Sequence, residues 1–344
     1  MTIQNLIRPT IKALKPYSSA RDEFQGVSAE MVFLDANENP FENGVNRYPD
    51  PHQNKLKTLL SQIKNVPTQN MLLGNGSDEV LDLIFRMFCE PYVDNVIILP
   101  PTYGMYEVLA NLNAVKTIKV PLSNNFQPEI DSILNASNSK SKILFLCSPN
   151  NPTGNSFSSI EVETLLNKFG GIVVIDEAYI DFSKQSSWLD RLEEFPNLIV
   201  TQTLSKAYGM AGIRLGICYA STEIIATLNT IKPPYNVNEL TQNKAIENLK
   251  NANLVKNQIG EILKERTDLI NELNKINFIS KIFPSDANFI LIKVDDANKR
   301  YNQLISKGIV IRNRTNQHNC ENCLRITVGT RTQNKRLLKI LKDL

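Results

Sequence analysis

The stretch GIVVIDEAYIDF, residues 171–182, contains four consecutive aliphatic residues followed directly by a carboxylate, Asp176. A short apolar run without alternation is typical of a strand covered on both faces, as in a parallel sheet with helices on either side. Asp176 would then stand at the carboxyl end of that strand, the edge where open α/β sheets bind ligands. A buried carboxylate is costly unless it meets a cation or caps a helix, and the pattern leaves both roles open.

Similar runs occur on both sides of this strand and alternate with helical patterns. The strand candidates are MLLG (71–74), VIILPP (96–101), VKTIKVPL (115–122), KILFLCSPN (142–150), LIVTQTLSK (198–206) and LGICYAS (215–221). The helical patterns include DEVLDLIFRMF (78–88) and SIEVETLLNKF (159–169), the second with Ser158 and Ser159 as expected caps. This alternation predicts an α/β fold with a mainly parallel, seven-stranded sheet.

The pattern changes after residue 237. A helical region at about 238–275 is followed by the strand FILIKV (289–294), the helix ANKRYNQLISKG (297–308), the strands IVIR (309–312) and LRITVG (324–329), and a terminal helix. We therefore expect an N-terminal arm at 1–40, a large unit at 41–237, and a smaller α+β unit at 238–344 that begins with a bridging helix.

Composition is that of an ordinary soluble globular protein, with 42% hydrophobic and 21% charged residues in 344. The formal net charge of +3 is too small to favour nucleic acid or a membrane surface as a partner. The N-terminus does not resemble a signal peptide, and no apolar run is long enough to span a bilayer. We therefore expect a cytoplasmic protein.

The cysteines and histidines favour neither a metal centre nor a histidine base. Cys89, Cys147 and Cys218 lie in apolar segments and are expected to be buried thiols. The stretch CENC at 320–323 has metal-ligand spacing, but no second pair of cysteines or histidines accompanies it, so no metal is expected. With only two histidines in the chain, both in polar contexts, we expect another residue to act as the general base.

Polar residues gather at the carboxyl ends of the predicted strands. The loop Gly74–Gly76 leads into a helix whose first N–H groups would form an anion site, although a capped turn without a ligand fits the same residues. The loop fails as a dinucleotide fingerprint, because Glu79 stands where a third glycine belongs. A turn at 150–154 offers two consecutive asparagines, one of which is expected to point into the crevice.

The segment TLSKAYGMAGIRLG, residues 203–216, completes this set, because Lys206 follows Ser205 and precedes Arg214. The ligand that fits is pyridoxal 5'-phosphate. Its phosphate suits the helix N-terminus, Ser205 and Arg214, and its aldehyde suits the amine of Lys206. Its protonated pyridine nitrogen is a cation for Asp176. We expect Lys206 to be largely desolvated, and we expect this and Arg214 to lower its pKa.

The chain also resembles, over nearly its full length, the fold-type I pyridoxal-phosphate-dependent aminotransferases, and within them most closely the branch that acts on histidinol phosphate. The motifs that carry the resemblance, in chain order, are KPYSSARDE, LDANENP, RYPDP, GNGSDE, PPTYGMY, SPNNPTG, IDEAY, TLSKAYGMAGIRLG and CLRITVGT. NPTG and SKAYG with AGIR mark the family strongly, and LDANENP with PTYGMY indicates the branch.

The resemblance implies roles around the cofactor ring. Lys206 would carry the cofactor covalently and then move a proton between the substrate's α-carbon and the cofactor. Asp176 would pair with the pyridine nitrogen, and Tyr103 would stack on the ring. Asn151 and Tyr179 would hydrogen-bond the ring hydroxyl oxygen.

It also implies how the cofactor phosphate is held. Ser77 and Asp78 would offer backbone N–H groups, together with Ser205 and Arg214. One departure is Ser77 itself, where the family commonly has a small apolar residue, and a backbone contact tolerates the change. Tyr48 would reach the phosphate in the neighbouring subunit, so the active unit would be a homodimer.

The substrate residues follow from the same resemblance. Arg325 would bind the carboxylate of glutamate, Arg312 and Tyr17 would bind the phosphate of the other substrate, and Asn37 would lie in the substrate site. Arg314 is an alternative to Arg312, because VIRNRTNQ offers both. The expected reaction converts L-histidinol phosphate and 2-oxoglutarate to imidazole-acetol phosphate and glutamate.

Other functions remain open from sequence alone. An aromatic-amino-acid aminotransferase and a threonine-phosphate decarboxylase of corrinoid synthesis would share the lysine and the fold. A nicotinamide-dependent dehydrogenase is disfavoured by the incomplete glycine fingerprint. A non-enzymatic regulator would normally carry a DNA-binding segment, and the N-terminal arm is too short and too neutral for one.

Overall fold

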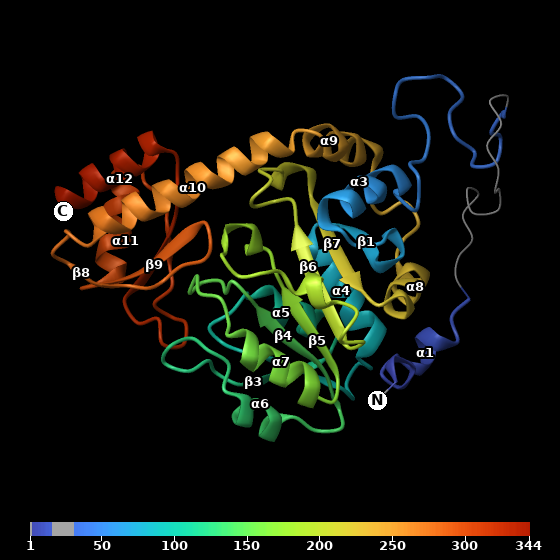
Figure 1. Cartoon of the computed structure of the whole chain (residues 1–344), viewed down its shortest axis with the longest axis horizontal. Helices are drawn as coiled ribbons and strands as arrows, with labels where there is room; N and C mark the ends of the chain where they lie inside the picture. The colour runs from blue at the N-terminus through green and yellow to red at the C-terminus, as the bar shows by residue number, and fades with distance from the viewer. Residues whose placement is uncertain (1, 16–30) are drawn as a thin grey trace.

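The computed structural model describes residues 2–15 and 31–344 as two units joined by a long helix, with the N-terminal segment beside the larger unit (Figure 1). The larger unit contains a seven-stranded sheet and the smaller one a four-stranded sheet. The predicted fold class, a mainly parallel seven-stranded α/β unit with a smaller α+β unit, is confirmed. The boundaries at residues 40 and 237 stay a prediction.

The large sheet has the strand order β1-β7-β6-β5-β4-β2-β3. Its strands are Met71–Asn75 (β1), Asn95–Ile98 (β2), Lys116–Lys119 (β3), Ser141–Cys147 (β4), Ile172–Asp176 (β5), Leu198–Thr203 (β6) and Leu215–Ala220 (β7). Strands β2 to β6 run parallel, whereas β7 pairs antiparallel with both β1 and β6. The carboxyl end of β5 therefore lies at the centre of the sheet, between β4 and β6.

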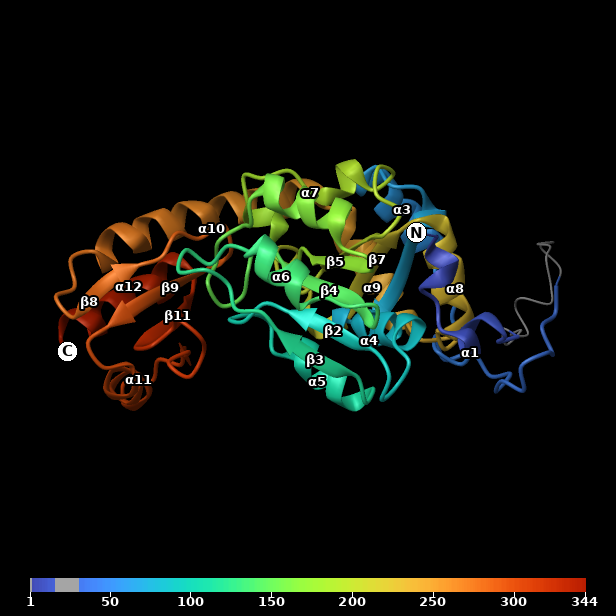
Figure 2. The same ribbon diagram turned by 90° about the horizontal axis from the view of Figure 1, so that it is seen from below.

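Helices cover both faces of this sheet, which explains why its inner strands are mostly apolar without alternation (Figure 2). They are Asn54–Lys64 (α3), Ser77–Phe88 (α4), Met105–Leu112 (α5), Ile130–Ala136 (α6), Ser159–Lys168 (α7), Thr222–Ile231 (α8) and Glu239–Leu249 (α9). One face packs against α3, α6, α7 and α9, and the other against α4, α5, α8 and the N-terminal segment at 3–7.

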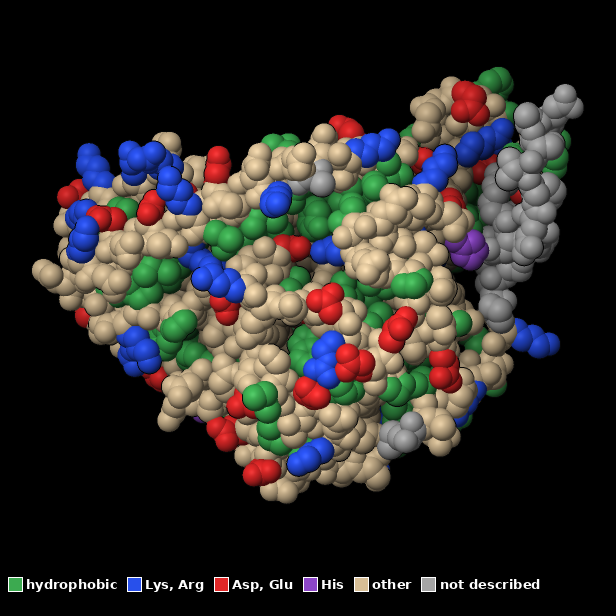
Figure 3. Space-filling model, in the orientation of Figure 1, with side chains coloured by type: hydrophobic (Ala, Val, Ile, Leu, Met, Phe, Trp, Pro, Cys, Tyr) green, Lys and Arg blue, Asp and Glu red, His purple; other side chains and the backbone are tan. Residues whose placement is uncertain are grey.

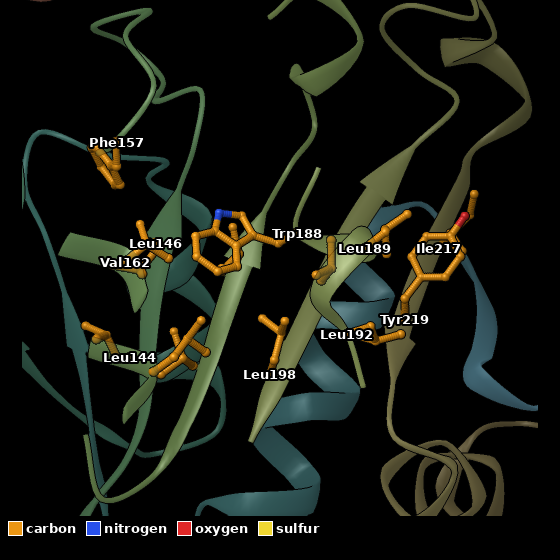
Figure 4. Close-up of a cluster of buried hydrophobic side chains, with 14 of the residues drawn as sticks. Leu144, Leu146, Phe157, Val162, Trp188, Leu189, Leu192, Leu198, Ile217 and Tyr219 are labelled. Carbon is orange, nitrogen blue, oxygen red and sulfur yellow. The ribbon is translucent and has the colours of Figure 1, made fainter. Parts of the chain in front are cut away.

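Strand β4 shows how the two cores share one strand. Leu144 and Leu146 belong to the core on the α7 side, whereas Ile143 and Phe145 belong to the core on the α4 side. Figure 4 shows part of the first core, where Trp188 lies close to Leu146. Each fully buried leucine contributes about 1.5–3 kcal/mol relative to exposure, so the sheet edge that carries the site has a stable base.

The smaller unit is built from Ala252–Leu273 (α10), Ile279–Ile282 (β8), Phe289–Val294 (β9), Ala297–Ser306 (α11), Arg312–Asn313 (β10), Cys323–Thr327 (β11) and Arg331–Lys342 (α12). Its antiparallel sheet has the order β10-β11-β9-β8. Helix α10 packs on α12 and β9 and also contacts the short 3-10 helix Ile180–Phe182 (η3) beside the large sheet. It therefore bridges the two units.

Shorter helical segments complete the chain. They are the α-helix Pro9–Lys12 (α1) and the 3-10 helices Ile3–Asn5 (η1), Thr68–Asn70 (η2), Trp188–Arg191 (η4) and Ala211–Ile213 (η5).

Three local predictions differ from the structure. The helical region at 238–275 is two helices, because Asn251 adopts a non-helical backbone and asparagines compete with the helix for backbone hydrogen bonds. The strand predicted at 309–312 shrinks to Arg312–Asn313, since Ile309 N–H donates to Leu304 and ties this segment to α11. Ser158 stands at the N-cap of α7, but its side chain accepts no capping bond, and Ser159 is already helical.

The surface carries both charge signs. On the face of Figure 3, lysine and arginine side chains are interspersed with aspartate and glutamate, in keeping with the small net charge. Within residues 2–15 and 31–344, no helix is long and apolar enough to cross a membrane.

Candidate active site

A cavity lies at the carboxyl ends of β4, β5 and β6, the edge where the sequence predicts a ligand. It encloses about 560 Å³ of space including its open mouth. The structure brings nine of the ten predicted cofactor residues together in its lining: Ser77, Asp78, Tyr103, Asn151, Asp176, Tyr179, Ser205, Lys206 and Arg214.

Asp176 ends β5 and is 4% exposed. Tyr106 donates its hydroxyl to Oδ2 at 2.7 Å, and the Ala178 N–H donates to Oδ1 at 3.1 Å. Burial raises the pKa of this carboxyl, and these two donors oppose the rise. Among the described residues, no lysine or arginine nitrogen lies within 4.0 Å of it. A protonated pyridine nitrogen would supply the missing cation, so the cavity fits pyridoxal phosphate at this point.

Lys206 leaves the turn after β6, and its Nζ lies 5.7 Å from the ring centroid of Tyr179. Burial lowers its pKa, and the positive charges of Arg325 and Arg214 lower it further. The predicted direction is confirmed. Lys206 lines the cavity but is exposed to solvent in the single chain, so it is only partly desolvated, less than the sequence led us to expect. Solvent therefore moderates the shift.

A second part of the cavity is suited to a phosphate. Helix α4 begins at Ser77, and Gly76 before it offers no side-chain cap, so the first N–H groups are open to an anion. A Cβ on Gly76 would lie 2.7 Å from the guanidinium of Arg214, so only glycine lets that side chain approach the helix end. Arg214 itself has a left-handed backbone, with φ of +55°.

Asp78 and Ser205 border the same end of the cavity. Asp78 accepts a hydrogen bond from the hydroxyl of Tyr103 at 3.0 Å, and its carboxylate lies 3.6 Å from the guanidinium of Arg214. Asp78 therefore holds both the Tyr103 ring and the Arg214 side chain in position. Ser205 Oγ lies 3.0 Å from the hydroxyl of Thr203, whose one proton also faces the Leu215 carbonyl at 3.1 Å.

In the turn after β4, one asparagine side chain lines the cavity, as predicted, and the other is buried in the turn. Asn150 is fully buried and donates to the Pro101 carbonyl at 2.8 Å, so it holds the turn. Asn151 lines the cavity, and its Oδ1 accepts a hydrogen bond from Nη1 of Arg325 in the smaller unit. The turn therefore links both units at the site.

Arg325, Arg312 and Arg314 form what we call the arginine cluster. Arg325 and Arg312 are register partners on β11 and β10. The Nε atoms of Arg314 and Arg325 are buried without a hydrogen-bond partner. Burial is the main cause that lowers the pKa of both side chains, and the neighbouring arginines add to it. No acidic side chain of the described chain lies within 4.0 Å of the cluster, which therefore suits an anionic ligand.

Three predicted residues lie elsewhere. Tyr48 is half-exposed and stacks on Tyr235 with ring centroids 4.5 Å apart. It lines a separate surface pocket together with Asn37, so a single chain does not bring these two to Lys206. Tyr17 lies outside the described residues.

The sequence reasoning missed Tyr106. This fully buried side chain stacks on Phe145 at 4.7 Å, contacts Tyr103 edge-on and supplies the shortest hydrogen bond to Asp176. The quoted motif PPTYGMY contains it, but nothing in its spacing shows that the second tyrosine reaches across to β5. The contact joins α5 to β5, which are 60 or more residues apart in the chain.

Comparison with known proteins agrees with this arrangement. Residues 30–341 match the family described as aminotransferase class I and II. The chain belongs to this aminotransferase family.

Among its relatives in the family is the histidinol-phosphate aminotransferase of Flavobacterium johnsoniae, which is 62% identical over 99% of this chain and 98% of its own. That of Parabacteroides distasonis is 53% identical over 99% of both chains. The crystal structure of the Clostridium acetobutylicum histidinol-phosphate aminotransferase superposes with a TM-score of 0.80 at 27% identity, covering 87% of this chain and 90% of that one.

For structural relatives that are less than 25% identical, the similarity shows only a common fold. The Sinorhizobium meliloti histidinol-phosphate aminotransferase, solved in complex with pyridoxal 5'-phosphate, is 22% identical with a TM-score of 0.79, covering 86% of this chain and 82% of its own. The Porphyromonas gingivalis L-threonine-O-3-phosphate decarboxylase is 24% identical with a TM-score of 0.72, covering 87% and 90%. The architecture alone therefore does not choose between transamination and decarboxylation.

Proposed function

We infer that this enzyme is a pyridoxal-phosphate-dependent aminotransferase of histidine biosynthesis. It transfers the amino group of L-histidinol phosphate to 2-oxoglutarate and yields imidazole-acetol phosphate and glutamate. The observation that carries the assignment is a cavity lined by a lysine and by a buried carboxylate without a cation, next to which Arg325 of the uncompensated arginine cluster donates to the lining residue Asn151. Full-length relatives at 53–62% identity carry this activity in their names, which favours it over the aromatic and decarboxylase alternatives.

Lys206 would act as covalent anchor and as the proton-transfer group. When bound, pyridoxal phosphate supplies an electron sink for the pair released at the substrate α-carbon. The lowered pKa of Lys206 raises the fraction of neutral amine, which is the form that accepts a proton. From the mouth of the cavity this amine would take the α-proton and return it to the cofactor side.

Other side chains would hold the ring and its phosphate. Asp176 would keep the pyridine nitrogen protonated, and its bond from Tyr106 would fix the carboxylate plane. Tyr103, pinned through its hydroxyl to Asp78, would cover one face of the ring. Tyr179 and Asn151 would donate to the ring oxygen.

The phosphate would lie between the N-terminus of α4, at Ser77 and Asp78, and the side chains of Ser205 and Arg214. This phosphate site would consist of backbone N–H groups, a hydroxyl and a guanidinium, which are the hydrogen-bond donors that suit a dianion.

The arginine cluster would bind the anionic end of each substrate. Arg325 would receive the carboxylate of glutamate, and Arg312 or Arg314 the phosphate of histidinol phosphate. Of these two, Arg314 has the buried orphaned donor, whereas Arg312 is exposed. A guanidinium binds carboxylate and phosphate in two-pronged geometry, so one cluster serves both half-reactions.

We also propose that the working unit is a cytoplasmic homodimer. The described segment before α3, residues 31–48, exposes large apolar side chains, including Leu34 at 87% and Phe41 at 78%, as expected of a surface that a second subunit covers. Tyr48 lies at the end of that segment and would complete the neighbouring subunit's phosphate site, and Asn37 would lie near its substrate.

Two measurements test the function. After incubation with pyridoxal phosphate and reduction with borohydride, the tryptic peptide containing Lys206 should carry the cofactor's mass, and no other lysine should. Turnover of histidinol phosphate should exceed that of phenylalanine and of threonine phosphate. Preferred turnover of phenylalanine, or release of carbon dioxide from threonine phosphate, would replace the assignment with one of the alternatives.

A further inference from the structure

The motif CENC, residues 320–323, has no part in the reaction proposed above. Its cysteines stand at the two ends of a tight turn, in which the Cys323 N–H donates to the Cys320 carbonyl at 2.9 Å. Asn322, with φ of +57°, allows the turn to close. Such turns keep their end Cα atoms within about 7 Å. Disulfides span Cα separations of about 4.4–6.8 Å, so the backbone already has the right spacing.

The two thiols are close enough to affect each other's titration. Both residues are fully buried beneath the exposed Glu321, whose carbonyl accepts a hydrogen bond from Cys323 Sγ at 3.7 Å. Its neighbour Cys320 is the main cause that lowers the pKa of the Cys323 thiol, and Lys293 and Lys281 add to this effect against burial. Cys323 is therefore the more nucleophilic member of the pair.

The other cysteines share the burial of this pair, but none of them lies within three residues of a second cysteine. Cys89, Cys147 and Cys218 are buried, and burial raises the pKa of each thiol. They serve as internal controls for reactivity. In the part of the chain that the structure describes, no three potential ligand residues are grouped to hold a metal, so CENC does not belong to such a set.

The turn is connected to the arginine cluster through the backbone. The Arg314 N–H donates to the Cys323 carbonyl at 2.8 Å, and Asn322 N–H donates to Thr315 at 2.9 Å. Two residues after Cys323, Arg325 pairs in register with Arg312. A shift of the Cys323 backbone would therefore move the guanidinium groups proposed to bind substrate.

We propose that Cys320 and Cys323 form a reversible, peroxide-sensitive disulfide that displaces the arginine cluster and weakens binding of the phosphorylated substrate. The sulfurs must approach each other to about 2.05 Å, which tightens the turn. The regulatory part rests on the proposed function, whereas the modification itself does not.

The chemistry balances with one peroxide. The Cys323 thiolate attacks a peroxide oxygen, the O–O bond breaks, and hydroxide leaves and takes up a proton as water. The Cys320 sulfur then attacks the Cys323 sulfur, the S–O bond breaks, and a second water leaves. Two thiols lose two electrons in total, and hydrogen peroxide gains them. A small dithiol reverses the step by exchange.

Mass spectrometry of the holoenzyme tests the modification. Trypsin cleaves after Arg314 and Arg325, so both cysteines fall in the single peptide TNQHNCENCLR. After hydrogen peroxide and alkylation, this peptide should lose two hydrogens and take no alkyl group, while the peptides of Cys89, Cys147 and Cys218 stay alkylated. Oxidation of these three at the same rate, or full alkylation of the CENC peptide, would overturn the proposal.

Single variants assign the order of attack. Cys320→Ser should leave a lone Cys323 that dimedone labels after peroxide, whereas Cys323→Ser should leave Cys320 unlabelled. Equal labelling of both would overturn the assignment of Cys323 as nucleophile. If either variant fails to fold by thermal melting, wild-type enzyme treated with iodoacetamide for limited times should still show Cys323 alkylated first.

Kinetics test the consequence. Oxidation should raise KM for histidinol phosphate by about fivefold or more, the lower end of usual coupling between sites, and dithiothreitol should reverse it. Cys320→Ser should show no such response. A disulfide that forms without any change in KM would overturn the regulatory role. If neither oxidised nor reduced enzyme turned over histidinol phosphate, the proposed function would fail while the mass measurement still decided the redox site.

Discussion

Lys206 lines the cavity with its Nζ 5.7 Å from the ring centroid of Tyr179, and we propose that it moves the substrate proton. We predict that Lys206→Ala lowers kcat by about 10²–10⁴ while leaving the far-ultraviolet circular dichroism unchanged, because a positioned acid–base group contributes that much. The matched control is Lys168→Ala, an exposed lysine in the last turn of α7, which should keep full activity. Near-normal turnover by the Lys206 variant would disprove its assigned role.

Tyr106 gives a second residue-scale prediction. Tyr106→Phe leaves Oδ2 of the buried Asp176 without its donor, at a cost of about 1–3 kcal/mol, and raises the pKa of that carboxyl further. We expect cofactor affinity to fall about tenfold, as measured by absorbance titration. The control is Tyr219→Phe, because the Tyr219 hydroxyl is buried without a partner and its loss should change nothing. Equal affinities for both variants would contradict this account.

At this scale, the sequence was sufficient to predict site residues whose charge is unusual next to a buried strand. Asp176 after four aliphatic residues and Lys206 after a buried strand both point to a ligand, and both line the cavity. Tyr106 could not be found this way, because a buried aromatic residue is ordinary and its partner is distant in the chain. The exposure of Lys206 was also missed, since a strand-end pattern does not report how open a cavity is.

At the scale of elements, two adjacent carboxylates have different tasks: Asp176 is the last residue of β5, and Glu177 follows it. Asp176 faces the cavity, whereas Glu177 accepts bonds from Ser187 Oγ, the Trp188 N–H and Gln202 Nε2, and so ties β5 to β6 and η4. Burial raises the pKa of Glu177 to about 7 from 4.5, against these donors.

This shift sets a pH dependence of stability. Because the folded pKa is raised, the stabilising contribution of Glu177 is full below about pH 4.5 and is lost as the pH rises through about 7. The stability of wild type relative to Glu177→Gln should therefore fall by about 3 kcal/mol between pH 5 and 8. Melting temperatures at both pH values check this, with the exposed Glu193→Gln as control. A constant difference between the two proteins would contradict it.

The elements that sequence predicts best are those buried on both sides. All seven runs in the large sheet appear as strands. Six of them are largely buried and therefore mostly apolar, whereas the edge strand β3 carries two exposed lysines. The edge strands β8 and β10 carry exposed polar residues and only a few partners, so their sequences do not differ from loops. Tertiary contacts, such as the tie between Ile309 and α11, decide where such short strands end.

At the scale of the whole molecule, Tyr48 lines a different pocket from Lys206 within a single chain. In the proposed homodimer, Tyr48 of one subunit would instead reach the cavity of the other. We predict that mixing Lys206→Ala protein with Tyr48→Phe protein under conditions that exchange subunits yields more activity than either variant alone. A mixed dimer would have one site with both an intact Lys206 and an intact Tyr48.

Activity after mixing should be compared with that of each variant re-equilibrated alone, and sedimentation should show dimers throughout. Activity no higher than the mean of the two separate variants would place Tyr48 and Lys206 in sites that do not share subunits. The order of motifs in the sequence cannot decide this, because an intersubunit contact leaves no mark in the spacing of one chain.

The arginine cluster, with two buried Nε donors that lack a partner and no described carboxylate within 4.0 Å, also affects how such experiments are run. Inorganic sulfate or phosphate in a crystallisation liquor or assay buffer would occupy the cluster and compete with both substrates. Apparent Michaelis constants would then climb with the concentration of that oxyanion, whereas chloride at matched ionic strength would leave them nearly level. Zwitterionic sulfonate-free buffers are thus the ones in which the true affinities of this enzyme would emerge.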